Sequence, residues 1–435
     1  MSKQRIHEHM ERMREELQAM ALDIWAHPEA GFREVHASRI QKEFLERLGA
    51  RIKSPIDMLD TAFVAEYGEG KPIIGILGEF DALPGLSQKA GVNYKEPLKE
   101  GARGHGCGHN LLGTGGVAAF VACMQTMKED HLPGTIRYYG CPAEEIMSGK
   151  IVMMKQGVFQ DLDVAVTWHP FDRNRISNDI WQSQDIKNYT FHGVSAHASR
   201  NPENGRSALD AAELMNIGVN YLREHVPTDV RMHYAYIDNG QPANVVPDLA
   251  KTNYFIRSNK RSRTEDVSQR VDSCAKGAAL MTGTTVDIEL LGSCKEMKVN
   301  RVLAELYYQA MKEIPTPKYT NEELSFAANI SKEANLPNNG IYFTGLEPLE
   351  PAPVPISIGT DAAEVSHAVP LITISAATMC KGTPLHHWAA AKQAGMSIGQ
   401  KGMLYAARCM AEGTKLLLEQ PEKLKEAWEF HKTTG

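Results

Sequence analysis

Short apolar segments that end in a polar residue alternate with helical segments in the first part of the chain. Four of them have the composition of buried strands: 61–66, 73–79, 135–140 and 163–168. A segment rich in small residues, 113–127, predicts a helix between the second and the third of these strands. Strands that alternate with helices, and carry reactive side chains at their carboxyl ends, are typical of an open parallel sheet. The sequence therefore predicts an α/β fold with a mostly parallel central sheet.

A different order of elements begins near residue 186. From there to about residue 290 the pattern predicts helices and strands in the order β-α-β-β-α-β, which is that of the ferredoxin-like unit. The α/β pattern returns after about residue 298, with strands expected at 354–358 and 371–376. We therefore predict a principal domain in two parts, 1–185 and 298–435, interrupted by an inserted α+β domain at 186–297.

The composition is that of an ordinary globular protein. Of 435 residues, 43% are hydrophobic and 23% are charged. The formal net charge of −6 is spread without long runs, so we expect neither nucleic acid nor a membrane surface as a partner. The charged, helix-prone beginning of the chain does not resemble a signal peptide. Seven scattered cysteines, an odd number, predict free thiols and a cytoplasmic location.

The stretch 104–110, Gly-His-Gly-Cys-Gly-His-Asn, places Cys107 and His109 close together among glycines. Glycine permits a tight backbone, so that two side chains can converge on one point. A thiolate and an imidazole are ligands of borderline-soft divalent metals. A Cys-x-His pair alone indicates a metal site only weakly, but its position just before a predicted helix favours one.

Further candidate ligands follow the predicted strands. Glu144 and Glu145 come after one strand, where one carboxylate would bind metal and the other face an attacking water; an exposed acidic turn is the alternative. His169 ends another strand, where a core or capping histidine is the alternative. Of the pair His386-His387, one would be a ligand and the other its neighbour. Together these groups predict a metal-dependent hydrolase.

Several longer stretches resemble those of one known family. They are ILGEFDALPGLSQ at 76–88, GHGCGHNLLGTG at 104–115, YYGCPAEE at 138–145, TWHP at 167–170, SAHAS at 195–199, NVVP at 244–247 and GTPLHHW at 382–388. Through them the chain resembles, nearly end to end, the aminoacylase and carboxypeptidase-G-like metallopeptidases, in their amidohydrolase branch. The resemblance implies that the α/β domain is catalytic and that the inserted ferredoxin-like domain is a lid that usually dimerises.

The resemblance also implies roles for single residues. Two divalent metal ions per subunit, manganese or zinc, would be held by five side chains: Cys107, His109, Glu145, His169 and His386. Cys107 would bridge the ions, with Glu145 and His386 on one of them and the other two histidines on the second. Glu144 matches the general base. Asp81 matches the acidic residue behind the metals that orients a ligand.

Three residues of the inserted domain match positions that contact substrate. His197 matches the histidine that family dimers lend to the active site of the partner subunit. Asn244 and Arg257 match lid residues that hold the substrate, and a guanidinium suits a carboxylate. Where many relatives have Asp and His, this chain has Asn110 and Leu112, which we interpret as features of its branch.

The implied reaction is hydrolysis of the amide bond of an N-acyl amino acid. The leading substrate is p-aminobenzoyl-glutamate or a related N-acyl-glutamate or -aspartate. The alternatives are a dipeptidase and an amidase for aryl- or indole-acyl amino acids, and the short segment 335–358 bears on this choice. A non-catalytic subunit of a two-subunit hydrolase is a third interpretation, which the complete ligand set disfavours. We expect a homodimer, or a heteromer with a related A-like subunit.

Overall fold

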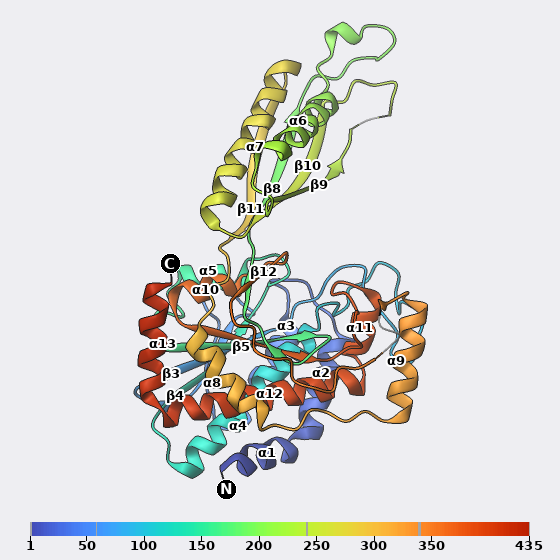
Figure 1. Ribbon diagram of the computed structural model, residues 1–435. Helices are drawn as coiled ribbons and strands as arrows, with labels where there is room; N and C mark the ends of the chain where they lie inside the picture. The colour runs from blue at the N-terminus through green and yellow to red at the C-terminus, as the bar shows by residue number, and fades with distance from the viewer. Residues whose placement is uncertain (1, 58, 241, 338–340, 435) are drawn as a thin grey trace. The chain divides into compact units, whose positions relative to one another are not determined.

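The computed structural model describes every residue except 1, 58, 241, 338–340 and 435 (Figure 1). Contacts divide the chain into two units. Unit 1 contains Met1–Asp179, Lys298–Val354 and Val365–Gly435. Unit 2 contains Ile180–Met297 and Pro355–Glu364. The limits of the inserted domain drawn from sequence, residues 186 and 297, stay a prediction.

Unit 1 is built around a seven-stranded sheet in the order β1-β2-β4-β3-β5-β13-β6. Its strands are β1 (Arg51–Lys53), β2 (Phe63–Glu69), β3 (Ile73–Glu79), β4 (Gly134–Cys141), β5 (Val164–Phe171), β6 (Arg175–Ile176) and β13 (Leu371–Ala377). The four central strands pair in parallel, and the outer ones pair antiparallel. The central strands are buried on both faces, which explains their continuous apolar runs. The strand expected at 354–358 is β12 (Val354–Ile356), which pairs with β7 (Asp179–Trp181) in a separate two-stranded sheet.

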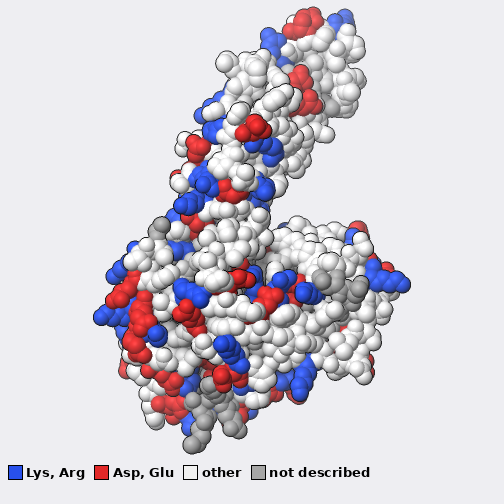
Figure 2. Space-filling model, in the orientation of Figure 1, with Lys and Arg blue, Asp and Glu red and all other residues white. Residues whose placement is uncertain are grey.

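Helices surround this sheet (Figure 1). They are α1 (Ser2–Arg12), α2 (Arg14–Ala26), α3 (Val35–Arg47), α4 (His109–Asp130), α5 (Gly149–Lys155), α8 (Arg301–Lys312), α9 (Asn321–Glu333), α10 (Ala362–Ala368), α11 (Trp388–Ala394), α12 (Ser397–Glu419) and α13 (Pro421–Thr433). Within the part of the chain that the structure describes, none of the helices combines the length and apolar character that crossing a membrane requires. Acidic and basic side chains are interspersed over the visible surface (Figure 2).

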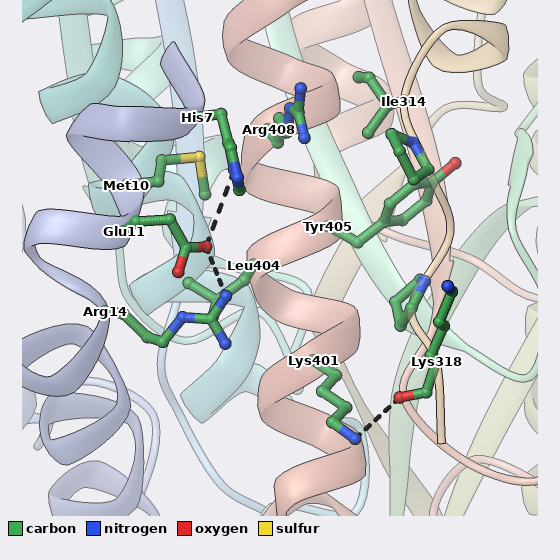
Figure 3. A pocket seen from close by; sticks show the side chains of 12 residues that line it. His7, Met10, Glu11, Arg14, Ile314, Lys318, Lys401, Leu404, Tyr405 and Arg408 are labelled. Carbon is green, nitrogen blue, oxygen red and sulfur yellow. Dashed lines mark hydrogen bonds and ion pairs between the residues drawn. The ribbon is translucent and has the colours of Figure 1, made fainter. Parts of the chain in front are cut away.

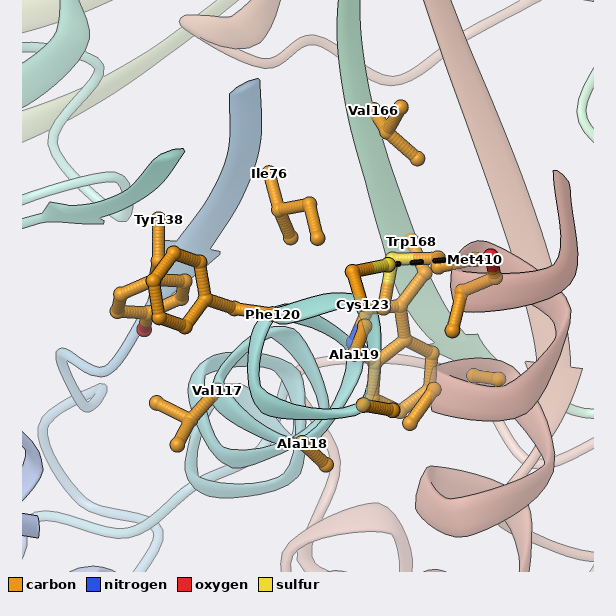
Figure 4. Packing of buried hydrophobic residues seen from close by; sticks show 14 of the residues in the cluster. Ile76, Val117, Ala118, Ala119, Phe120, Cys123, Tyr138, Val166, Trp168 and Met410 are labelled. Carbon is orange, nitrogen blue, oxygen red and sulfur yellow. Dashed lines mark hydrogen bonds between the residues drawn. The ribbon is translucent and has the colours of Figure 1, made fainter. Parts of the chain in front are cut away.

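Helix α4 packs closely on the sheet because its residues are small. A Cβ atom on Gly115 would lie 2.8 Å from the Trp168 indole nitrogen, and one on Gly116 would lie 2.8 Å from the Tyr138 ring. Trp168 Nε1 donates a hydrogen bond to the Leu112 carbonyl at 2.9 Å. Phe120 and neighbouring apolar side chains fill the remaining space (Figure 4). This packing sets the N-terminus of α4 at the carboxyl ends of the parallel strands.

Unit 2 contains a four-stranded antiparallel sheet in the order β11-β8-β10-β9. Its strands are β8 (Ser183–His192), β9 (Arg231–Asp238), β10 (Leu249–Ser258) and β11 (Thr285–Cys294), and its helices are α6 (Ala208–Leu222) and α7 (Arg261–Thr282), with the short turns η1 (Pro202–Asn204) and η2 (Arg223–His225). Both long helices pack on the sheet around a common apolar core. The chain order β-α-β-β-α-β is ferredoxin-like. The expected fold class is confirmed for both units.

Candidate metal centre

The carboxyl ends of three adjacent parallel strands meet at one edge of the main sheet. β3 ends at Glu79, so Asp81 follows it directly, and β4 ends at Cys141, just before the two glutamates. β5 carries His169 near its end, and β3 lies between β4 and β5. Helix α4 begins at His109 and brings the Cys-x-His pair to the same edge.

The structure brings all five predicted ligands together. Cys107 Sγ lies 3.5 Å from His169 Nε2 and 3.5 Å from His386 Nε2. His386 Nε2 lies 3.4 Å from Glu145 Oε2. The donors form two groups of three, each within 4.8 Å: Cys107 with His109 and His169, and Cys107 with Glu145 and His386. The two groups share the thiol.

This donor set fits two divalent metal ions. Ligand atoms that share one tetrahedral zinc lie roughly 3.3 Å apart, close to the separations between these donors. His109 Nε2 is fully buried and is one of the donor atoms that lie close together. Burial, and then the neighbouring Glu145 charge, raise the pKa of the Cys107 thiol, a cost that a bound cation would remove. Thiolate, imidazole and carboxylate together are the ligands of zinc and similar borderline ions.

Asp81 forms a hydrogen bond with one residue of each donor group. Its Oδ1 accepts a hydrogen bond from His109 Nδ1 at 2.9 Å, and its Oδ2 accepts one from the Glu145 backbone N–H at 2.9 Å. Burial opposes ionisation of Asp81, but the His109 hydrogen bond and charge lower its pKa. The bond to Nδ1 leaves Nε2 of His109 facing the other ligands, as expected for an orienting carboxylate.

Burial also sets the charge states of two predicted ligands. Burial raises the pKa of Glu145 to about 8. The positive charge of His109 opposes this rise, and the negative charges of Asp81 and Glu79 add to it. Burial lowers the pKa of His169 to about 4, helped by the His109 charge, so this imidazole is neutral and keeps a lone pair for a metal.

The two adjacent histidines have different partners. His386 has a left-handed backbone, with φ 57°, and its N–H bonds to the Gly106 carbonyl at 3.1 Å, next to Cys107. His387 instead accepts a bond from the Ala389 N–H and caps α11. Asn110 points elsewhere as well, since its amide donates to the carbonyls of Ala21 and Ala394.

A buried ion pair beside the centre was missed from sequence. Glu79 Oε2 lies 3.3 Å from His109 Nε2, and Glu79 Oε1 lies 2.5 Å from the Lys150 ammonium. Glu79, His109 and Glu144 form another group of possible donors. Glu79 could have been predicted from the sequence, because residues two apart on an extended chain face the same side and Asp81 was already a candidate. Nothing in the sequence indicates that Lys150 belongs to the site, since a lysine in a helix is usually exposed.

Glu34 was missed too, and it braces the turn that carries Glu144. Its carboxylate is fully buried and accepts bonds from the N–H groups of Ala143, at 2.8 Å, and Phe32, at 3.1 Å. Both residues have left-handed backbones, with φ 55° and φ 61°. Gly31 packs so closely that a Cβ there would lie 3.0 Å from Ala143 Cα. A non-glycine residue in this conformation needs such support.

Replacing Glu34 with alanine is expected to lower kcat by roughly 10-fold to 10²-fold, because the turn that carries Glu144 loses its brace and the carboxylate predicted to act as the base moves. Bound metal should stay, since Asp81 still holds the Glu145 N–H. Glu34→Gln keeps an acceptor oxygen for the Ala143 N–H and should therefore keep most of the wild-type rate. Kinetics and metal content of the purified variants check this.

A matched control is Glu29→Ala on the same segment. The Glu29 carboxylate accepts hydrogen bonds from the N–H groups of His36 and Ala37 at the start of α3, whereas the Ala143 N–H bonds to Glu34. Its loss should reduce stability by about 1 kcal/mol, as for other helix caps, with kcat unchanged. An equal fall of kcat in both alanine variants would show that Glu34 acts only through general stability.

The three predicted lid residues lie in two places within unit 2. His197 pairs with Val245 in an isolated bridge, and the Ala198 N–H bonds to the Asn244 carbonyl at 3.0 Å, so His197 and Asn244 are neighbours. Arg257 lies near the far end of β10, opposite Gln184, whereas Leu249 begins that strand. Eight residues of strand span roughly 26 Å, so Arg257 does not join the other two within one chain. Their roles stay predictions.

A cavity elsewhere in unit 1 contains none of these residues. It has a volume of about 250 Å³ and lies between α1, α2, α12 and the segment 314–318 (Figure 3). Glu11, one of its lining residues, pairs with Arg14 and lies 3.7 Å from His7. The residues that line this cavity are therefore different from those of the metal centre.

The fold and the shared-thiol donor set define a metal-dependent hydrolase. Residues 75–391 match the model of peptidase family M20/M25/M40, and the chain belongs to this family. It is 37% identical to the B-type subunit of p-aminobenzoyl-glutamate hydrolase from Escherichia coli (strain K12), in an alignment that covers 95% of this chain and 91% of the relative. It is 29% identical to the Xaa-Arg dipeptidase of Homo sapiens over 63% of each chain.

A solved structure shares the fold. It is that of a protein from Bacillus subtilis described as a dinuclear metal binding peptidase from the M20 family, with a TM-score of 0.61 and 17% identity over 94% of this chain and 99% of that one. The enzyme class expected from the sequence, a metal-dependent hydrolase of the amidohydrolase and peptidase type, is confirmed.

Proposed function

We propose that this chain hydrolyses the amide bond of an N-acyl amino acid, with p-aminobenzoyl-glutamate as its leading substrate. The observation that carries the proposal is the pair of three-donor groups that share Cys107 Sγ, with the Glu144 carboxylate beside them. The near full-length similarity to a hydrolase component named for this substrate supports the choice of substrate.

We assign one divalent ion to each donor group, manganese or zinc. When bound, the ions lower the pKa of a water molecule toward neutrality and polarise the scissile carbonyl. Thiolate and imidazole suit zinc, whereas carboxylates suit manganese. Cys107 would be the shared ligand, with His109 and His169 on one side and Glu145 and His386 on the other.

The remaining residues of the site move a proton and hold the substrate. Glu144 accepts the proton of the attacking water and passes it to the leaving amine; it is largely buried and lies 3.8 Å from His109 Nε2. Asp81 keeps His109 and Glu145 in orientation. His197 of a second subunit would stabilise the oxyanion, and Asn244 and Arg257 would bind the substrate. Among the described residues, none forms a hydrogen bond with the buried Nε of Arg257, which suits a carboxylate partner.

We further propose that the chain assembles through unit 2. Apolar side chains there are exposed, with Tyr221 at 76%, Leu280 at 85% and Met281 at 68%. Strands β9 and β11 are the two edges of its sheet. Exposed apolar groups and open edges are typical of interfaces. A homodimer is expected, and a heteromer with an A-type subunit is the alternative that the name of the bacterial relative supports. All seven cysteines are free thiols, which supports a cytoplasmic location.

The test is a substrate panel on the purified, manganese-loaded or zinc-loaded chain. Glutamate release from p-aminobenzoyl-glutamate is expected. A dipeptide ending in arginine is the second candidate, because the human relative is named for that reaction. An indole-acyl aspartate completes the panel. Turnover of the dipeptide alone would replace the proposed substrate. Activity that begins only when an A-type subunit is added would assign the chain a supporting role.

A further inference from the structure

We propose that Asp23, His27 and His36 form an additional metal site on unit 1, for zinc or a similar divalent ion. Asp23 lies near the end of α2, His27 directly follows this helix, and His36 lies in the first turn of α3. None of the three belongs to the donor groups around Cys107. The site would therefore join two helices at a distance in sequence from the centre.

The three side chains already have the arrangement of a ligand set. His27 Nδ1 lies 2.9 Å from one carboxylate oxygen of Asp23, and His36 Nε2 lies 3.0 Å from the other. The centroids of the two imidazole rings are 4.6 Å apart. One donor atom from each residue lies within 4.8 Å of the others. Donors around a tetrahedral zinc need separations of roughly 3.3 Å, so small rotations of the side chains suffice.

Two imidazoles that face the two oxygens of one carboxylate offer three donors to a single cation. A divalent ion is neutralised in part by Asp23 and uses a lone pair of each ring. Two histidines and one carboxylate with an open fourth position are a ligand set that zinc adopts.

The site is accessible, and the cationic side chain of Arg39 beside it has another partner. The side chains of Asp23, His27 and His36 are 41%, 59% and 27% exposed, so an ion can enter from solvent. Arg39 lies 3.2 Å from His36 Nδ1, but it also binds both oxygens of Glu43 at 2.9 and 3.1 Å. Arg39 can therefore remain on Glu43 when His36 turns toward a metal.

A metal here would hold the segment between His27 and His36 in place. This segment contains Glu34, which braces the turn that carries Glu144. His27 and His36 flank this segment, and the Glu29 carboxylate within it binds the His36 N–H at 2.9 Å. The Glu29 carbonyl accepts a bond from the Ala82 N–H at 2.9 Å, next to Asp81, and Glu34 holds Ala143. The metal would thus connect the end of α2 with the start of α3, the two helices that flank this segment.

The test is cobalt titration of the metal-free wild-type chain, of His36→Gln and of His192→Gln. His192 is the matched control, because it lies 2.9 Å from Asp287 but belongs to none of the donor groups found among the described residues. The wild type and His192→Gln are expected to bind one more equivalent of cobalt than His36→Gln. The thiolate-to-cobalt absorption, which reports on Cys107, should be the same in all three.

Equal cobalt binding by the wild type and His36→Gln would overturn the proposal, and so would an equal loss in His192→Gln. The number of cobalt equivalents that each protein binds does not depend on whether the chain hydrolyses the proposed substrate. Absence of the thiolate band from all three proteins would contradict the centre at Cys107, while the difference of one equivalent would still support the site at Asp23.

Discussion

Replacing Glu144 with alanine is expected to lower kcat by roughly 10²-fold to 10⁴-fold while metal stays bound. The carboxylate is largely buried beside His109, where it can take a proton from a water molecule held at the centre. It is not a member of either donor group that contains Cys107, so its removal leaves both ligand sets complete. Steady-state kinetics on p-aminobenzoyl-glutamate, with metal analysis of the same preparations, measure both effects.

Two further variants separate proton transfer from a general disturbance of the turn. Glu144→Gln keeps the size of the side chain but cannot accept the proton, so its kcat should be as low as that of the alanine variant. Ile146→Ala changes an exposed side chain, 47% accessible, in the same turn and should keep the rate. Full activity of Glu144→Gln would exclude Glu144 as the base.

The elements that position the centre could be predicted from the sequence, because their residues follow simple rules. β3, β4 and β5 are apolar runs, and parallel strands bring their carboxyl ends to one edge. Asp81, Glu144 and His169 are therefore expected to lie near one another from the sequence alone. The glycines around Cys107 indicated the tight approach to α4. What the residues alone left open, such as the choice between His386 and His387, depends on a backbone conformation that sequence does not specify.

The remaining groups could not be predicted because their environment is set by tertiary contacts. Glu34 follows Arg33 and directly precedes a helix, where a surface position is the usual expectation, yet it is completely buried where Gly31 packs against Ala143. Lys150 lies in a short helix, yet it is buried, and its ammonium pairs with Glu79. His27 and His36 meet only because α2 and α3 pack together. Local patterns carry no information on such encounters between distant segments.

Replacing Cys107 with alanine is expected to remove metal from both positions of the centre, and with it all activity. The thiol belongs to both three-donor groups, so its loss leaves two ligands on each side. Loss of residues that only support a ligand weakens metal binding by about 10-fold to 100-fold, and loss of a shared ligand should exceed this. Metal content after dialysis against a fixed concentration of free zinc measures the effect.

Cys123 provides the matched control for this variant. It is similarly buried, lies in α4, and its thiol donates to the Ala411 carbonyl at 3.8 Å and belongs to none of the donor groups found among the described residues. Cys123→Ala should therefore cost some stability through lost packing but keep its metal and its rate. Cys107→Ser, with a harder and less acidic donor of similar size, should bind metal more weakly than the wild type and better than the alanine variant. If Cys107→Ala retained both ions, the thiol would not be a shared ligand, and the carboxylate of Glu79 beside His109 would become the first candidate to replace it.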